Sequence, residues 1–167
     1  LHRQHQRLKS SGIELSRGTL TRLCQRSIEL LRPIADAQLA HILQSQVLSM
    51  DETPIRAGPA KNKKGKGVMK QAWFWPLMGD QGEIAFTFSA SRGRVHIENT
   101  LKNHFAGTLV SDGYVAYSSY AAKNAQITHA NCWVHGRRQF VEAEGDEPEL
   151  VKQVIDSIGH LYQVEAQ

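Results

Sequence analysis

The spacing of apolar residues changes near residue 47, and this change constrains the fold more than any other feature of the sequence. Residues 13–46 carry apolar side chains at intervals of three and four, which is typical of amphipathic helices. Ser16 is placed to cap the first of these helices, and Pro33 fits the first turn of a second one. From Val47 onward, short apolar runs and alternating segments predict β-strands. The chain is therefore expected to combine helices with a sheet.

The segments after residue 47 predict a mixed sheet. A first strand ends at Asp51, a Gly/Lys loop follows over residues 58–70, and Pro76 is expected to end the second strand or to mark a bulge. The later segments are strands at 73–77, 84–88, 108–111 and 127–132, and helices at 97–107, 114–120, 133–144 and 148–164. The order β-β-β-α-β-α-β-α is that of an α/β, ribonuclease H-like mixed sheet, incomplete here and preceded by a short helical segment.

The change in the spacing of apolar residues also predicts that the chain has two domains. Residues 1–46 form a helical lead, and residues 47–167 form the ribonuclease H-like core. Basic side chains lie on the outer side of the lead, at Arg17, Arg22 and Arg26. The lead fits two interpretations: a DNA-binding helix-turn-helix remnant, or a helical linker with a solvated basic face.

The charge and cysteine content narrow the classes of protein. The chain has 20 Lys and Arg against 16 Asp and Glu, a net charge of +4, which permits binding to a polyanion without requiring it. Two cysteines are too few for a disulfide scaffold and suit a reducing cytosol. The polar, basic first residues do not resemble a signal peptide, and no apolar run approaches the roughly 20 residues of a membrane span. We therefore expect no membrane partner.

Two aspartates follow strands that are neighbours in the predicted sheet. Asp51 ends the first strand and Asp112 ends the fourth. Because α/β sheets bind ligands beyond the carboxyl ends of their strands, the two carboxylates are expected to face each other there. Paired carboxylates favour a shared Mg²⁺, which prefers oxygen ligands. The alternative is that both aspartates cap turns, since Asp112-Gly113 is a common turn pair.

Several short segments occur in the order found in transposases of the bacterial insertion sequence sixty-six family. The matching segments are Leu15-Ser16-Arg17-Gly18-Thr19-Leu20, Leu30-Leu31-Arg32-Pro33, Asp51-Glu52-Thr53-Pro54, Ser91-Arg92, Ser111-Asp112-Gly113-Tyr114 with Tyr117, Cys132-Trp133-Val134-His135-Gly136-Arg137-Arg138-Gln139-Phe140 and Ile158-Gly159-His160-Leu161-Tyr162. Each segment alone is unspecific, but their common order makes the chain resemble this family from about residue 12 onward.

The resemblance implies a DDE transposase, an enzyme that cuts and joins DNA with metal-bound carboxylates. It makes Asp51 the first and Asp112 the second catalytic acid, with Mg²⁺ or Mn²⁺ as cofactor and two ions in the intact enzyme. It implies element ends and target DNA as partners, a homo-oligomer on DNA, and a bacterial cytoplasmic, nucleoid-associated location. The family's third acid is a Glu in a downstream Asn-Asn-x-x-Glu segment, which this sequence lacks. The chain alone is therefore expected to be inactive; the alternatives are an inactive DNA-binding remnant and a ribonuclease H-like nuclease.

The remaining candidates are basic residues and one histidine. His135 is expected to begin a helix near the acids, and the resemblance implies a catalytic role for it in orienting DNA or a metal-bound water. A zinc site at Cys132 and His135 lacks the four ligands that a closed site needs. Phosphate contacts are expected from Arg92, from the pair Arg137 and Arg138, and from the lysine-rich loop at Lys61, Lys63, Lys64 and Lys66. For the arginine pair and the lysine loop, the alternative is a solvated surface.

Overall fold

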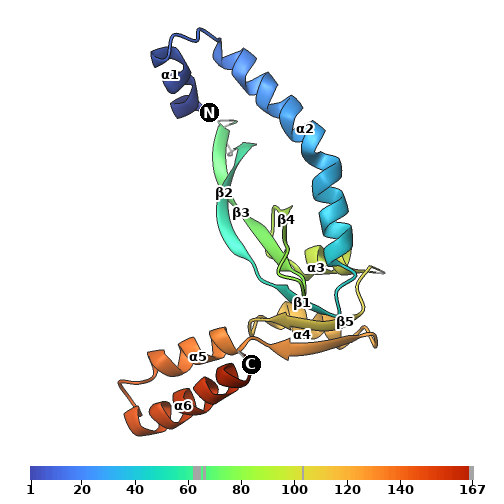
Figure 1. The fold of residues 1–167 in the computed structure, drawn as a ribbon, viewed down its shortest axis with the longest axis vertical. Coiled ribbons are helices and arrows are strands. Elements are labelled where there is room, and N and C mark those ends of the chain that lie inside the picture. Colours follow the sequence, from blue (N-terminus) through green and yellow to red (C-terminus); the bar gives the residue numbers. More distant parts are fainter. Residues whose placement is uncertain (62–64, 66, 103, 166–167) are drawn as a thin grey trace. The chain divides into compact units, whose positions relative to one another are not determined.

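The computed structural model describes residues 1–61, 65, 67–102 and 104–165, without the side chains of residues 59–61 and 165 (Figure 1). The chain divides into two compact units, Leu1–Ala40 and His41–Gln167, and each is described by itself. None of the helices in these ranges has the length and apolar content that crossing a membrane requires. The predicted domain boundary after residue 46 stays a prediction.

The first unit contains α1 (His2–Ser10) and most of α2 (Arg17–Ile42). Ser16 caps α2 as predicted, because the Thr19 backbone N–H donates to its Oγ at 3.0 Å. The predicted break into two helices at Pro33 is wrong, since Pro33 lies inside the single helix α2. Proline there removes one backbone hydrogen bond without ending the helix. The helix-turn-helix interpretation, which rested on two short helices in this region, has no support from α2.

The second unit is built on a six-stranded mixed sheet with the order β2-β3-β1-β5-β6, in which β4 also pairs with β3 (Figure 1). The strands β1, β5 and β6 run parallel to one another, whereas β3 is antiparallel to β1, β2 and β4. Their bounds are β1 (Val47–Met50), β2 (Thr53–Lys61), β3 (Gly67–Met78), β4 (Ile84–Ser89), β5 (Gly107–Ser111) and β6 (Ile127–Asn131). The predicted mixed α/β sheet is confirmed, and its arrangement is consistent with a ribonuclease H-like order.

The first two strands form one extended segment that is interrupted at Asp51 and Glu52. Met50 pairs with Leu77 of β3, and after the interruption Thr53 pairs with Phe74, so both strands keep the same register against β3. The Asp51 backbone N–H still donates to the carbonyl oxygen of Pro76, at 3.3 Å. The first strand therefore stops where the sequence predicted, but the chain resumes pairing three residues after Met50.

Two sequence predictions fail in this hairpin. Of the Gly/Lys loop predicted over residues 58–70, the part up to Lys61 belongs to β2 and the part from Gly67 belongs to β3, while residues 62–64 and 66 lie outside the described residues. Pro76 lies inside β3, opposite Phe86 of β4, and does not end its strand. Proline lacks an N–H, but its carbonyl group still accepts a hydrogen bond, so the ladder continues around it. Composition predicted a loop and a break, and backbone pairing within the hairpin overrides both.

The core of the second unit lies between the sheet and the short helices α3 (Arg94–Leu101) and α4 (Val115–Ala121), where α3 contacts α4 and α4 contacts β6. The helix predicted to reach Gly107 ends at Leu101, and Gly107 instead begins β5 with a φ of 149°. A Cβ atom at Gly107 would collide with the Gln46 carbonyl oxygen. The largest fully buried side chains are Trp75, Tyr117, Ile42, Leu48, Met50, Leu77, Ile97, Leu101 and Leu109.

Two further features complete the second unit. The helices α5 (Trp133–Glu142) and α6 (Pro148–Glu165) pack against each other after β6.

On the sheet, β3 and β4 expose three aromatic side chains, Phe74, Phe86 and Phe88. The Phe74 ring makes edge contacts with the other two, at centroid distances of 6.4 and 6.1 Å. This face of the hairpin is therefore apolar and accessible to solvent.

Candidate metal centre

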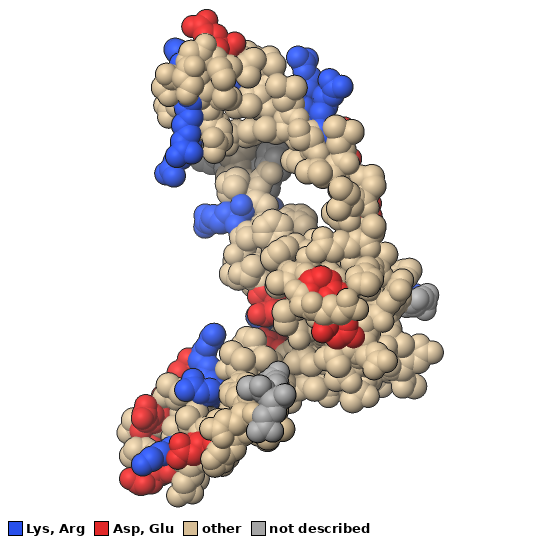
Figure 2. Space-filling model, in the orientation of Figure 1, with Lys and Arg blue, Asp and Glu red and all other residues tan. Residues whose placement is uncertain are grey.

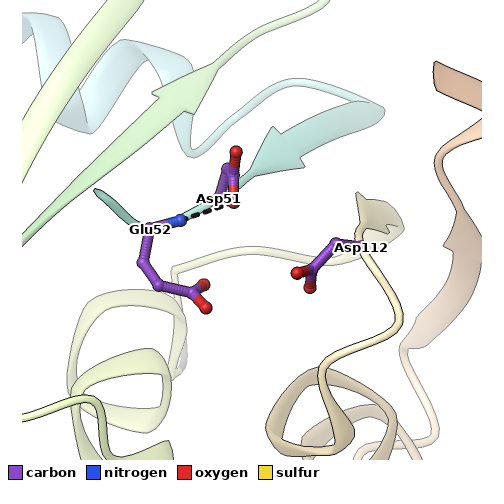
Figure 3. A group of neighbouring side chains, drawn as sticks. All are labelled: Asp51, Glu52 and Asp112. Atoms are coloured by element: carbon purple, nitrogen blue, oxygen red, sulfur yellow. Dashed lines mark hydrogen bonds between the residues drawn. The ribbon is translucent and has the colours of Figure 1, made fainter. Parts of the chain in front are cut away.

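The register of the parallel strands places Asp51 beside Asp112. Ser49 of β1 lies opposite Val110 of β5, and the same register two residues further along brings Asp51 opposite Asp112. Oxygen atoms of these two carboxylates and of Glu52 all lie within 4.8 Å of one another (Figure 3). The predicted proximity of Asp51 and Asp112 is therefore observed, while their role as metal ligands stays a prediction.

Each aspartate has one oxygen fixed by a backbone amide. The Glu52 N–H donates to Asp51 Oδ1 at 2.7 Å, and the Tyr114 N–H donates to Asp112 Oδ1 at 2.9 Å. The turn-capping alternative is thus partly correct, but it uses only one oxygen of each carboxylate. The Asp51 side chain is 49% exposed and Asp112 is half-buried, so both carboxylates remain accessible from solvent. Their orientation is set without blocking them.

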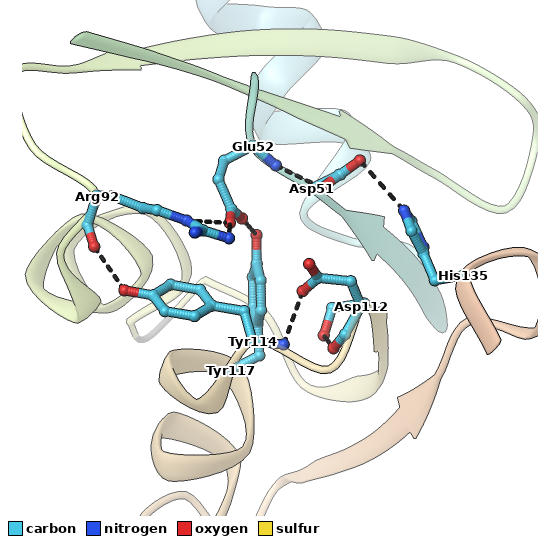
Figure 4. Close-up of polar contacts among 8 residues, drawn as sticks. Asp51, Glu52, Arg92, Asp112, Tyr114, Tyr117 and His135 are labelled. Atoms are coloured by element: carbon cyan, nitrogen blue, oxygen red, sulfur yellow. Dashed lines mark hydrogen bonds and ion pairs between the residues drawn. The ribbon is translucent and has the colours of Figure 1, made fainter. Parts of the chain in front are cut away.

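Glu52, which the sequence did not single out, is buried beside this pair. Its side chain is 1% exposed, and both carboxylate oxygens have protein partners. Oε1 accepts from Arg92 Nε at 2.6 Å and lies 2.5 Å from Nη2, and Oε2 accepts from the Tyr117 hydroxyl at 2.6 Å (Figure 4). The sequence signals are its adjacency to Asp51 and the place of Glu52, Arg92 and Tyr117 in segments that carry the family resemblance. Neither signal shows that the partners converge.

Arg92 is held on several sides. Its guanidinium carbon lies 4.1 Å from the ring centroid of Tyr114 and 5.3 Å from that of Trp73. The Tyr114 hydroxyl donates to the Arg92 carbonyl oxygen at 2.7 Å, which fixes the backbone as well (Figure 4). The Arg92 side chain is nevertheless 42% exposed. It is a cation with a fixed position and an open face.

Burial and neighbouring charges shift the pKa values of Tyr117 and Arg92. Burial, the hydrogen bond to Glu52 and the nearby carboxylates raise the pKa of Tyr117 far above its ordinary value of 10.0. Burial lowers the pKa of Arg92, but the hydrogen bond and charge of Glu52 outweigh it, and the net shift is upward. Tyr117 is therefore a neutral donor and Arg92 a permanent cation.

His135 lies in the first turn of α5, where its Nε2 is 3.9 Å from Asp51 Oδ2 (Figure 4). The position near the acids agrees with the sequence prediction. Its buried Nδ1 has no hydrogen-bond partner in the described part of the chain. Within the same part, the acidic group is the only cluster of three or more potential metal ligands, so nothing supports a zinc site at Cys132 and His135.

An apolar pocket of about 220 Å³ adjoins Asp51 and His135. Its lining includes Pro76, Met78 and Ile84, which lie on the same face of the sheet. The pocket makes one flank of the acid pair apolar, whereas Arg92 and the tyrosines make another flank polar. The site therefore has two chemically different sides.

The predicted DNA-contacting residues are only partly brought together. Arg92 lies beside the acids, whereas Arg137 and Arg138 are exposed on α5. Figure 2 shows acidic and basic side chains interspersed over α5 and α6, so this hairpin is not a purely basic surface. Lys63, Lys64 and Lys66 lie outside the described residues, as does the side chain of Lys61. Phosphate binding by all of these residues stays a prediction.

Comparison with known proteins gives one family and two relatives. The family model described as "Transposase IS66 family" matches residues 1–167. The chain is similar to two uncharacterised proteins of Sinorhizobium fredii, y4qI with 28% identity over 156 residues and y4hP with 30% identity over 152 residues. Each match covers 85% of this chain but only 28% and 26% of the relatives, respectively. The chain thus spans about a quarter of the length of these relatives.

Proposed function

The chain belongs to the IS66 family of transposases, and we propose that Asp51 and Asp112 hold a divalent metal ion for DNA strand cleavage and strand transfer. The observation that carries this proposal is the register of β1 and β5, which brings both carboxylates to the same sheet edge. This is the edge at which α/β sheets bind ligands. The proposed partners are element-end and target DNA, bound by more than one copy of the protein.

The donor set fits Mg²⁺ or Mn²⁺, since both prefer carboxylate oxygens. Two carboxylates this close repel each other unless a cation lies between them. When bound, such ions supply activation of a water or 3′-hydroxyl and stabilisation of the leaving oxygen. The chain's own residues orient the ligand oxygens, through the backbone amides that bind Asp51 and Asp112. His135, next to Asp51, is placed to hydrogen-bond that carboxylate or a DNA phosphate.

Manganese binding tests the metal centre directly. We expect the 167-residue chain to bind Mn²⁺, measured by electron paramagnetic resonance, and Asp51→Asn or Asp112→Asn to weaken binding at least roughly tenfold, since each removes a charged ligand. Asp156→Asn, an exposed acid on α6, is the matched control and should leave binding unchanged. Equal Mn²⁺ affinity in all four proteins would refute the proposal.

We also propose that this chain alone does not cleave element-end DNA. Glu52, the third acid of the cluster, is already bound by Arg92 and Tyr117, so Asp51 and Asp112 have no free third carboxylate beside them within the described residues. Clamping both reacting oxygens requires a complete ligand set, and small misplacements reduce the rate by orders of magnitude. A chain extended by an Asn-Asn-x-x-Glu segment should cut labelled DNA, and the 167-residue chain should not.

Comparable cutting by the two chains would contradict this proposal and would make Glu142 or Glu144, which follow His135 in the sequence, the candidates for the third ligand. The alternative functions give other results. A DNA-binding remnant binds DNA but not Mn²⁺, and a ribonuclease H-like nuclease cleaves an RNA–DNA hybrid in preference to element ends. Weak DNA binding that falls steeply with salt is expected in every case, because neutralising phosphates releases counterions.

A further inference from the structure

Beside the acid pair, Glu52, Arg92 and Tyr117 form a hydrogen-bonded cluster that the proposed metal centre does not use. We propose that Arg92 binds one DNA phosphate next to Asp51 and Asp112, and that Glu52 and Tyr117 are positioning residues that hold Arg92 for this contact. This inference rests on the proposed function for the identity of DNA as the partner. It assigns Glu52 to the protein's own cation and not to the metal.

The contacts of Glu52 argue against a role as metal ligand. A carboxylate that binds a metal must present a free lone pair, and most of the roughly four on Glu52 already face donors. Arg92 Nε and Nη2 both approach Oε1, and the Tyr117 hydroxyl donates to Oε2. Withdrawing the carboxylate would leave the Tyr117 hydroxyl, which belongs to a fully buried residue, without its acceptor. An unpartnered buried polar group destabilises the folded state. Glu52 is therefore more stable as the counterion of Arg92.

The guanidinium of Arg92 keeps donors for a ligand. It has five N–H groups, and Glu52 engages Nε and Nη2 only. Within the described residues, Nη1 has no hydrogen-bond partner. The flanking rings of Trp73 and Tyr114 restrict the guanidinium plane, and the side chain is 42% exposed. A planar, pre-oriented guanidinium with open donors is the preferred partner of a phosphate.

The position of Arg92 also offsets the repulsion between the two aspartates and a DNA phosphate. Asp51 and Asp112 repel an approaching phosphate, so the site needs fixed donors as well as a metal ion. Asp112 lies near enough to contribute to the electrostatic environment of Arg92. Glu52 neutralises much of the charge of Arg92 at long range, so the contribution of Arg92 is a directed hydrogen bond rather than general attraction. An exposed, unpaired arginine would instead contribute mainly general electrostatic attraction and little directed hydrogen bonding.

A double-mutant cycle separates positioning from charge. Arg92→Lys keeps the charge but loses the planar fork, and it is compared in the natural chain and in the Glu52→Gln chain. Affinity is measured with a fluorescein-labelled DNA duplex in EDTA, so that the metal centre plays no part. We expect Arg92→Lys to weaken binding roughly fivefold to tenfold in the natural chain and less than about twofold in the Glu52→Gln chain, because the fork is no longer held there.

Arg94 provides the matched control, since it forms a helical surface ion pair with Glu98 at 2.8 Å. Arg94→Lys should change affinity less than about twofold in the natural chain and in a Glu98→Gln chain. A Mn²⁺ titration of Glu52→Gln should match the natural chain, a result that loss of a metal ligand could not give. If Glu52→Gln does not fold, Tyr117→Phe replaces it in the cycle. This variant keeps the Glu52–Arg92 pair but removes the hydroxyl that holds Glu52, so Arg92→Lys should weaken DNA binding less in the Tyr117→Phe chain than in the natural chain.

Three results would overturn the inference. No effect of Arg92→Lys in the natural chain would show that Arg92 does not contact DNA. An equal effect in both backgrounds would show that Glu52 does not position it. Weakened Mn²⁺ binding in Glu52→Gln would make Glu52 a ligand. Because the DNA assay is metal-free and the Mn²⁺ assay DNA-free, failure of the metal centre and failure of this inference are distinguishable.

Discussion

Replacing Tyr117 with phenylalanine removes one hydroxyl group from the centre of the second unit. That hydroxyl donates to Glu52 Oε2 at 2.6 Å, and both residues are buried. The ring remains, and with it the edge contact to Trp75 at a centroid distance of 6.3 Å, so packing changes little. The expected loss is therefore that of one hydrogen bond to a charged acceptor, about 1.5–3 kcal/mol of unfolding free energy.

Urea denaturation followed by tryptophan fluorescence measures this loss, since Trp75 is fully buried next to Tyr117. With an m-value of about 2 kcal/mol/M, the midpoint should fall by roughly 1 M while m stays unchanged. Tyr120→Phe is the matched control: Tyr120 is buried on the same helix, and its hydroxyl has no hydrogen bond in the described part of the chain. It should change stability by less than about 0.5 kcal/mol. Equal losses for the two variants would refute the argument that Glu52 depends on Tyr117.

Three further predictions follow from the same structure. The pKa of Tyr117 is raised on folding from 10.0, so its stabilising contribution is present below pH 10 and is lost as the pH rises towards the folded-state value; Tyr117→Phe should therefore lose less stability than the natural chain in alkaline urea titrations. Gly107→Ala should be destabilising by more than about 2 kcal/mol, since its Cβ would meet the Gln46 carbonyl at a positive φ; a thermal melt matching the natural chain would contradict this. Phe86→Ser combined with Phe88→Ser should reduce binding of an apolar fluorescent dye, because both rings are exposed; unchanged dye fluorescence would mean that the dye binds elsewhere.

The sequence predicted those features that depend on one strand or one helix at a time. Asp51 and Asp112 were found because each follows an apolar run, and the fold order made those runs neighbours. Ser16 was found because a cap lies next to the helix that it caps. These signals are local. The only long-range assumption is that the strands ending at Asp51 and Asp112 are parallel neighbours. That assumption is met in the pairing of β1 with β5.

The features that the sequence missed depend on distant partners. Glu52 looks like part of a polar turn, and its burial depends on Arg92 and Tyr117, 40 and 65 residues away. The strand β2 was missed because its end is rich in Gly, Pro and Lys, which composition alone assigns to a loop. Pro33 predicts the start of a helix, because proline inside a longer helix is unfavourable, yet α2 continues through it. For Glu52 and β2, a local preference is overridden by partners that the sequence pattern does not display.

The interruption between β1 and β2 explains how neighbouring acids serve different purposes. In a regular strand, consecutive side chains point to opposite faces, and Asp51 and Glu52 would be kept apart. At the interruption their carboxylate oxygens come within 4.8 Å of each other and of Asp112. Arg92 then neutralises the buried Glu52, so the half-exposed pair Asp51 and Asp112 carries the two uncompensated charges. One divalent cation balances two such charges, which is why the paired aspartates, and not the three-acid cluster, define the proposed metal centre.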